Sequence, residues 1–192
     1  MMRIITGKAR GIKLTTLEGE MTRPTAERTK EAIFSMIQFD IEGRRVLDLF
    51  AGSGQLGLEA LSRGAAEAVM VDQSKEAVKV INQNVEKTKL RDGATVICAE
   101  FAEFLRGKRG AKPFDIIFLD PPYAMRAVSA AIIALEGAGL IKDTTKIVCE
   151  SGEPSPLGDQ TDLAKRYTVL KSAKYGRAYV TLLTPRSEEE TV

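Results

Sequence analysis

Four short apolar segments of this sequence are each followed by an acidic residue, and these four carboxylates are the candidate functional groups of the chain. These residues are Asp48, Asp72, Glu100 and Asp120. In an open α/β sheet, ligands bind beyond the carboxyl ends of the strands. If the apolar segments are parallel strands of one sheet, the four carboxylates share one edge and can bind hydroxyl, amino or cationic groups of a ligand.

The sharpest pattern is Asp120-Pro121-Pro122-Tyr123. Proline fixes its own φ, lacks an N–H and restricts the residue before it, so the pair holds the Asp120 side chain and the Pro121 carbonyl rigidly. Two acceptors aimed at one point suit an NH₂ group, which donates two hydrogens, and Tyr123 can stack on a planar ring. The pattern predicts a clamp for the exocyclic amine of a nucleobase. The alternative is a strand end followed by a surface tyrosine.

A glycine-rich turn follows Asp48, with the spacing Gly52-x-Gly54-x-x-Gly57. Glycines at these positions permit a tight turn and a close approach of the backbone to a ligand. The same spacing occurs in dinucleotide sites. However, Asp48 would repel a pyrophosphate, whereas it would pair with the sulfonium and ammonium groups of S-adenosylmethionine. The alternative role for Asp48 is to cap the turn through backbone N–H groups.

The next two carboxylates suit the rest of that cofactor. Asp72 can accept hydrogen bonds from both ribose hydroxyls, and capping of the following helix is compatible with this role. Glu100 can accept from an adenine amino group with Phe101 beside the ring, although Glu103 is an alternative acceptor and Phe101 could belong to the core. The residues expected to contact S-adenosylmethionine are Asp48, Phe50, Ala51, Gly52, Gly54, Asp72, Gln73, Glu100, Phe101 and Asp120.

The composition limits the chemistry further. The chain has 192 residues and no histidine, which excludes histidine-based nucleophile triads and histidine-containing zinc sites; we expect no metal.

The net charge is only +2, yet basic residues gather at 1–14, 106–112 and 165–177. Such clusters suit contacts with a phosphate backbone; the alternative is a solvated surface with acids nearby. Cys98 and Cys149 lie in apolar segments and are expected to be small core residues.

Apolar segments alternate with helical patterns, as in a parallel sheet with helices on both faces. The expected strands are 45–49, 68–71, 95–98, 114–119 and 146–149, followed by a hairpin at 166–172 and 177–184. The expected helices include 26–38, with Thr25 as N-cap, 75–88, 101–106 and one around 128–135. This topology, with its closing hairpin, is that of the seven-stranded, mostly parallel sheet of Rossmann-like methyltransferases.

The predicted organisation has three parts. Residues 1–22 form a small β-hairpin extension with strands at 3–7 and 11–17, 23–185 form one α/β domain, and 186–192 form a disordered acidic tail. No segment has the pattern of a signal peptide or a membrane span, so we expect a cytoplasmic protein without membrane partners.

Several motifs together resemble one known family. They are Gly7-Lys8-Ala9-Arg10-Gly11, Arg23-Pro24-Thr25 with Arg28 and Glu31-Ala32-Ile33-Phe34, Asp48-Leu49-Phe50-Ala51-Gly52-Ser53-Gly54, Leu58-Glu59-Ala60-Leu61-Ser62-Arg63-Gly64-Ala65 and Val148-Cys149-Glu150-Ser151. Asp120-Pro121-Pro122-Tyr123 is similar to the motif of enzymes that methylate adenine N6, cytosine N4 or guanine N2. From about residue 3 to 184 the chain resembles the RsmD-type family of small-subunit ribosomal RNA guanine-N2 methyltransferases. It departs from the family pattern at Gln55 and at Glu100-Phe101.

This resemblance implies transfer of a methyl group from S-adenosylmethionine to the N2 amine of a guanine in small-subunit ribosomal RNA, with the Asp120–Tyr123 motif around that amine. The implied partner is the RNA of an assembling or assembled small ribosomal subunit, bound by a monomer. The residues expected to contact RNA are Arg3, Lys8, Arg10, Arg23, Thr25, Arg28, Lys174 and Arg177.

Three other functions remain open at this point. A DNA adenine-N6 or cytosine-N4 methyltransferase is the nearest, although little chain is left for a separate base-recognition domain. An RNA-binding assembly module with an inactive methyltransferase fold is the second. A nicotinamide dehydrogenase is the least favoured, because no feature of the sequence binds pyrophosphate preferentially.

Overall fold

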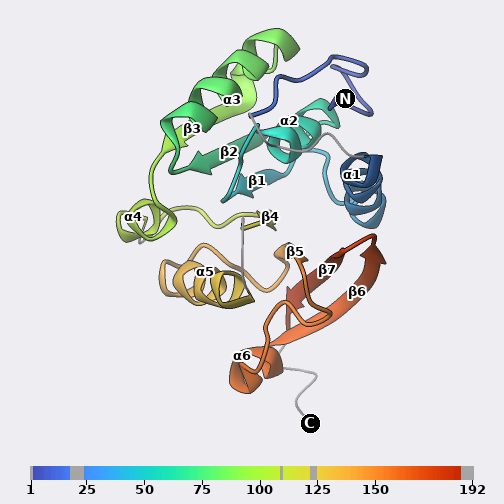
Figure 1. The fold of residues 1–192 in the computed structure, drawn as a ribbon. Coiled ribbons are helices and arrows are strands. Elements are labelled where there is room, and N and C mark those ends of the chain that lie inside the picture. The colour runs from blue at the N-terminus through green and yellow to red at the C-terminus, as the bar shows by residue number, and fades with distance from the viewer. Residues whose placement is uncertain (1, 18–23, 109, 122–124, 187–192) are drawn as a thin grey trace.

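The computed structural model describes residues 2–17, 24–108, 110–121 and 125–186, without the side chains of 24–26 and 125–126. Seven strands form one sheet in the order β3-β2-β1-β4-β5-β7-β6 (Figure 1). Their bounds are β1 Arg45–Asp48, β2 Glu67–Asp72, β3 Ala94–Cys98, β4 Ile116–Leu119, β5 Lys146–Ser151, β6 Tyr167–Tyr175 and β7 Ala178–Pro185. Strand β7 is antiparallel to both of its neighbours, and the other pairs are parallel. The predicted seven-stranded, mostly parallel sheet is confirmed.

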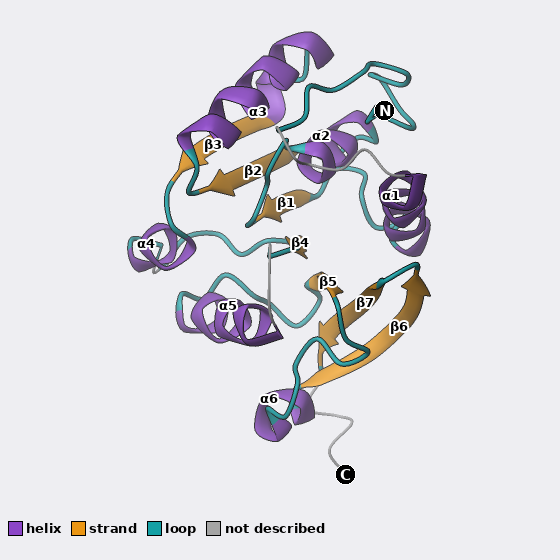
Figure 2. Cartoon of the chain, in the orientation of Figure 1, coloured by secondary structure: helices purple, strands orange, loops and turns teal. Residues whose placement is uncertain are grey.

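Helices cover both faces of the sheet (Figure 2). They are α1 Pro24–Met36, α2 Gln55–Ser62, α3 Lys75–Thr88, α4 Phe101–Arg106, α5 Met125–Gly137 and α6 Thr161–Lys165, with a 3₁₀ turn at Arg91–Gly93. Apolar residues of α1, α2 and α3 pack into one cluster on one face, and those of α4, α5 and α6 pack into a second cluster on the other. The first of these two faces is called the α1–α3 face below.

Alternation along β1 decides where its acidic residue lies. Val46 packs into the cluster on the α1–α3 face, whereas Leu47 packs into the cluster on the opposite face. Because successive side chains of a strand point to opposite faces, Asp48 lies on the α1–α3 face, beside α2. There its side chain is only 1% exposed.

Two predictions about single residues need correction, and one helix was missed. Helix α1 begins at Pro24, so Thr25 lies in its first turn rather than before it; proline is favoured at the first helical position because the N–H it lacks has no partner there. Cys98 is exposed, not in the core, because β3 is an edge strand; Cys149, in the inner strand β5, is buried as expected. Helix α6 was not predicted.

The segment before α1 folds back on itself and packs on α2. Ile4 donates its N–H to the Ile12 carbonyl at 3.0 Å and accepts from Gly11 at 2.8 Å. In place of the predicted strands at 3–7 and 11–17, the structure has one antiparallel bridge, between Arg3 and Lys13. Several backbone N–H groups of this segment donate to α2 and α3 instead of to a partner strand.

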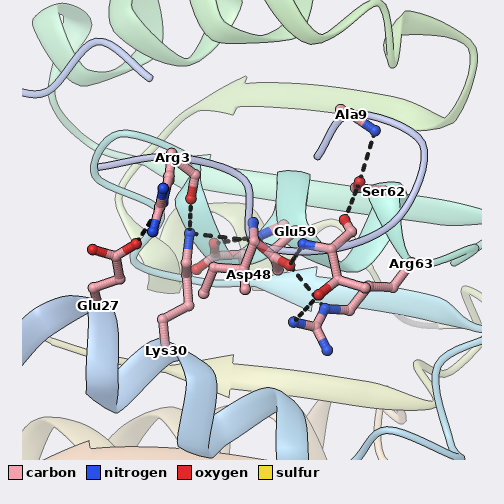
Figure 3. A network of polar contacts seen from close by, with 11 residues as sticks. Arg3, Ala9, Glu27, Lys30, Asp48, Glu59, Ser62 and Arg63 are labelled. Carbon is pink, nitrogen blue, oxygen red and sulfur yellow. Dashed lines mark hydrogen bonds and ion pairs between the residues drawn. The ribbon is translucent and has the colours of Figure 1, made fainter. Parts of the chain in front are cut away.

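Glu59 of α2 is one of the anchors of this segment (Figure 3). Its carboxylate, which is fully buried, accepts the N–H groups of Ile5 at 2.8 Å and Thr6 at 3.0 Å. It also pairs with Arg63 at 2.8 Å and with Lys30 of α1 at 3.3 Å. The Lys30 side chain is 2% exposed and donates to the Arg3 carbonyl at 2.5 Å. One buried ion pair therefore ties three separate parts of the chain together, and removal of either charge would leave the other uncompensated.

Among the residues that the structure describes, none of the helices has both the length and the apolarity needed to cross a membrane. In the same part of the chain, Cys, Asp and Glu side chains form no cluster of three or more arranged to hold a metal ion.

Candidate active site

A cavity of about 490 Å³ opens at the carboxyl ends of β1, β2, β3 and β4. All four of the acidic residues that the sequence analysis singled out line this cavity. Its lining is Leu17, Asp48, Leu49, Phe50, Ala51, Gly52, Gln55, Leu56, Asp72, Gln73, Ala99, Glu100, Phe101, Asp120, Pro121 and Ala127. The sequence named ten cofactor contacts, and nine of them line this cavity; Gly54 is the exception.

Asp48 is a buried residue of the cavity lining, and only one of its two carboxylate oxygens accepts a hydrogen bond from the described residues. Its Oδ2 accepts the N–H of Gly57 at 3.1 Å, so the carboxylate binds a backbone N–H in the first turn of α2, directly after the glycine turn. Its Oδ1 is buried and has no hydrogen-bond partner in the described part of the chain. Burial, together with the negative charge of Asp72, raises the pKa of Asp48 to about 7, and the bond from Gly57 opposes this shift. A cationic ligand would favour the charged form of this carboxylate.

Gly54 in the glycine turn and Gly57 in the helix after it leave little room for a side chain. Gly54 has φ of 77°, and a Cβ atom there would lie 3.1 Å from Ile81 and 3.2 Å from Met70. At Gly57, one turn into α2, a Cβ atom would approach Met70 to 2.6 Å. Gly54 thus permits the turn, and Gly57 permits close packing of α2 on β2, so that the first N–H groups of α2 come up to the cavity.

Asp72 joins two of the loops that line the cavity. Its Oδ2 accepts from Gly52 at 2.8 Å and its Oδ1 accepts from Ser74 at 2.8 Å. The N-cap of α3 is Ser74, which accepts from Ala77, so Asp72 does not itself cap that helix. Each carboxylate oxygen retains acceptor capacity, and the predicted contact with ribose hydroxyls stays a prediction.

Glu100 and Phe101 begin α4 at the far side of the cavity. Glu100 is the N-cap of α4 and accepts from Ala102 at 2.9 Å and Glu103 at 3.3 Å. The rings of Phe101 and Phe50 have centroids 5.7 Å apart and an interplanar angle of 56°. The two rings form an apolar wall suited to a planar ligand group. The contact of Glu100 with an adenine amino group stays a prediction.

Asp120 and Pro121 directly follow β4 and complete the lining. Because β4 lies beside β1 with Phe118 level with Asp48, Asp120 stands two residues further toward the open edge than Asp48. Pro122 and Tyr123 lie outside the described residues.

Sequence reasoning missed Asn84, a buried amide of α3 that connects the N-terminal segment to the glycine turn. Asn84 accepts the N–H of Thr15 at 2.8 Å and donates to the carbonyls of Thr15 and Ser53, both at 2.9 Å. Two residues beyond Thr15, Leu17 enters the cavity lining. The available signal was an amide at a core-facing position of α3, between the apolar residues Ile81 and Val85.

The basic residues predicted to contact RNA lie in three places. Lys174 and Arg177 are exposed at the turn between β6 and β7. Since Glu150 of β5 pairs with Val180 and Ser151 pairs with Tyr179, this turn projects from the same edge of the sheet as the cavity.

Lys8 and Arg10 are also exposed, but at the other end of α2. The N–H of Lys8 donates to Ser62, the last residue of α2, at 2.8 Å. An eight-residue helix is about 12 Å long, which separates these two residues from the cavity.

The remaining predicted RNA contacts are on or before α1. Arg3 is exposed and pairs with Glu27 at 2.7 Å, and Arg28 is exposed. Arg23 and the side chain of Thr25 lie outside the described residues.

Comparison with known proteins identifies relatives that span nearly the same length. YlbH of Bacillus subtilis, provisionally named an rRNA methyltransferase, is 38% identical over 164 residues, which cover 82% of this chain and 89% of YlbH. Ribosomal RNA small subunit methyltransferase D of Haemophilus influenzae is 36% identical over 157 residues and 81% of each chain. The solved structure of yhhF from Escherichia coli, provisionally named a methyltransferase, has a TM-score of 0.82 and 29% identity, over 97% of this chain and 99% of that one.

A family model described as Conserved hypothetical protein 95 matches residues 2–184. Together with these relatives and the fold they share, this match shows that the chain belongs to that family of methyltransferases.

Proposed function

We propose that this protein transfers a methyl group from S-adenosylmethionine to the exocyclic N2 amine of a guanine in small-subunit ribosomal RNA. The observation that carries the proposal is that Asp120 and Pro121 line the same cavity as Asp48, Asp72 and the glycine turn. The relatives named as ribosomal RNA methyltransferases support RNA as the substrate.

The residues around the cavity fit S-adenosylmethionine. The buried and unpaired Oδ1 of Asp48 suits a cationic group, and the buried Oε1 of Gln55, also without a partner among the described residues, suits a donor of the ligand. In this proposal Asp72, which lines the cavity, accepts from the ribose hydroxyls, and Phe50 and Phe101 pack against the flat adenine ring. When bound, this cofactor supplies an electrophilic methyl group on a positively charged sulfur.

The contribution of the protein is to position and polarise the acceptor. The lone pair of a guanine N2 amine is delocalised into the ring, which makes it a weak nucleophile. Hydrogen bonds from its two hydrogens to the Asp120 carboxylate and the Pro121 carbonyl favour a more pyramidal nitrogen and stabilise the charge that builds on it. Alignment of nitrogen and methyl carbon supplies the remaining acceleration. The Asp120 carboxylate would take up the proton that the methylated nitrogen loses. No covalent enzyme intermediate is required, which suits a chain without histidine.

The RNA must present an unstacked guanine, because the amine cannot reach Asp120 from within a helix. We propose that Lys174 and Arg177 bind phosphates next to this guanine, since their turn projects from the cavity edge. Lys8 and Arg10 would then bind RNA further away. The substrate is proposed to be an assembling or assembled small subunit, which provides such a distant surface, and the protein is proposed to act as a cytoplasmic monomer.

The test compares methyl transfer with cofactor binding in Asp120→Ala. We expect methyl transfer to small subunits that lack the modification to fall by at least about 100-fold, while the Kd for S-adenosylmethionine changes far less. The exposed Asp143→Ala serves as the control and should match the wild type. Wild-type turnover by Asp120→Ala would refute the amine clamp, and transfer to duplex DNA alone would favour a DNA amino-methyltransferase.

A further inference from the structure

Glu150 is a half-buried carboxylate of β5 that neither the cofactor cavity nor the amine clamp uses. Strand β5 lies next to β4, on the side away from β1. Leu119 of β4 pairs with Cys149 of β5. The residues that come next in the sequence, Asp120 and Glu150, therefore lie beside each other. Adjacent strands are about 4.8 Å apart. Asp120 therefore stands between the cofactor cavity and Glu150.

The alternation of β5 shows which way Glu150 points. Ile147 and Cys149 pack into the cluster on the α4–α6 side of the sheet, whereas Val148 packs into the cluster on the α1–α3 face. Val180, the cross-strand partner of Glu150, belongs to the cluster on the α1–α3 face as well. The Glu150 side chain thus lies on the α1–α3 face, as Asp48 does, at the edge where the methyl acceptor must enter.

Glu150 differs from other half-buried carboxylates of this protein. Asp115 binds Lys142 and the N–H of Arg45, and Glu136 binds Arg166 and Tyr167. For Glu150, the described residues provide no hydrogen bond or ion pair, and burial raises its pKa. A partly desolvated carboxylate without a partner costs free energy, and a hydrogen-bond donor on the substrate would offset that cost.

We propose that Glu150 selects guanine by accepting the N1–H of the base whose N2 amine is held at Asp120. In guanine, the N1–H and the N2 amine are neighbouring donors on one edge, so two adjacent carboxylates can each accept from one of them. A purine that carries the same amine but a lone pair at N1 would place that lone pair against a carboxylate. This inference rests on the proposed function.

The experiment replaces the guanine at the methylated position, once mapped, with 2-aminopurine. This base keeps the N2 amine but has a lone pair at N1. Wild-type protein, Glu150→Gln and the neighbouring exposed control Glu153→Gln are compared on small subunits that carry either base. The amide of Gln can accept from N1–H and can also donate to an N1 lone pair.

We expect the wild type to prefer guanine over 2-aminopurine by at least about 100-fold in kcat/KM, since a site built to accept a hydrogen bond rejects an analogue that lacks the donor. In Glu150→Gln this preference should fall by about tenfold or more, with the Kd for S-adenosylmethionine unchanged. Glu153→Gln should keep the full preference.

The outcomes separate the two proposals. If the wild type transfers no methyl to guanine in any subunit, the proposed function fails and this inference fails with it. If the wild type methylates guanine and 2-aminopurine equally well, Glu150 has no selective role, whether or not the variant folds. If Glu150→Gln keeps the wild-type preference, Glu150 is structural and the proposed function stands.

Discussion

Asp48 and Gly57 are joined by a hydrogen bond of 3.1 Å that links the end of β1 to the first turn of α2. The bond uses one carboxylate oxygen and leaves the other buried without a partner in the described residues. In the ligand-free protein this arrangement lowers the stability of the fold, because a buried acceptor without a donor costs free energy. The arrangement is consistent with a carboxylate that is completed by a bound cation.

The first prediction concerns Asp48→Asn. The amide oxygen of Asn can still accept from Gly57, so the turn should persist, but the negative charge is lost. We expect the affinity for S-adenosylmethionine to fall by about 10- to 100-fold, which corresponds to about 1.4–2.7 kcal/mol. Titration calorimetry would measure this loss. An unchanged Kd in a folded variant would show that Asp48 only caps the turn.

The second prediction follows from the pKa of Asp48, which burial raises to about 7, from an ordinary value of about 3.9. Between these values the folded protein retains a proton that the unfolded chain has lost. The free energy of unfolding should therefore fall as the pH rises through this window, by up to about 4 kcal/mol. Denaturant titrations at pH 4.5 and pH 8 would measure the fall, and Asp48→Asn should lack this component.

The same linkage applies to binding. A cationic ligand favours the charged form of Asp48, so S-adenosylmethionine should release a proton from the wild type at pH 6 and none at pH 9. The binding enthalpy at pH 6 should then depend on the ionisation enthalpy of the buffer. A buffer-independent enthalpy at pH 6, or equal proton release by Asp48→Asn, would argue against pairing of this carboxylate with the ligand.

The third prediction compares two glycines. Gly57→Ala places a Cβ atom 2.6 Å from the buried side chain of Met70, and overpacking of this kind costs about 1–3 kcal/mol. For Gly137→Ala, at the end of α5, the added Cβ atom meets none of the described residues within 4 Å. Denaturation midpoints should show a loss of stability for Gly57→Ala and none for Gly137→Ala. Because Met70 also packs under Gly54, the first variant should bind the cofactor more weakly.

The fourth prediction concerns Asn84→Ala. This change leaves the N–H and carbonyl of Thr15 and the carbonyl of Ser53 without their partner, at a cost of about 2–4 kcal/mol. Hydrogen exchange should increase along 2–17, and cofactor affinity should fall about tenfold, since Leu17 lines the cavity.

Asn82→Ala is the matched control for this change. Asn82 is exposed, and within the described part of the chain its amide donates only to Val78 of the same helix. Removal of the Asn82 amide should leave both the hydrogen exchange along 2–17 and the affinity for S-adenosylmethionine as in the wild type. Equal effects of the two substitutions would mean that Asn84 does not couple the N-terminal segment to the cofactor turn.

The sequence predicted best what depends on neighbouring residues. The apolar strands, the glycine turn and the carboxylates after them are local patterns, and parallel topology brings their ends to one edge. Nine predicted cofactor contacts consequently line the cavity. Gly54 does not line it because it lies under the turn, against Met70 and Ile81.

What could not be predicted depends on contacts between distant parts of the chain. Asn84 binds Thr15, 69 residues away, and Glu59 binds Ile5, 54 residues away. Exposure of Cys98 follows from the order of strands in the sheet, which places β3 at an edge. The periodicity of a segment does not contain this information, because it reports only which face of an element is apolar.

The measurement that tests the central claim most directly is the identity of the methylated nucleoside. Small ribosomal subunits that lack the modification would be incubated with the protein and labelled S-adenosylmethionine, then digested and analysed by mass spectrometry. We predict that the label appears as N2-methylguanosine. Label in another nucleoside, or none in subunits and in naked ribosomal RNA, would contradict the assignment of Asp120 and Pro121 as a clamp for a guanine amine.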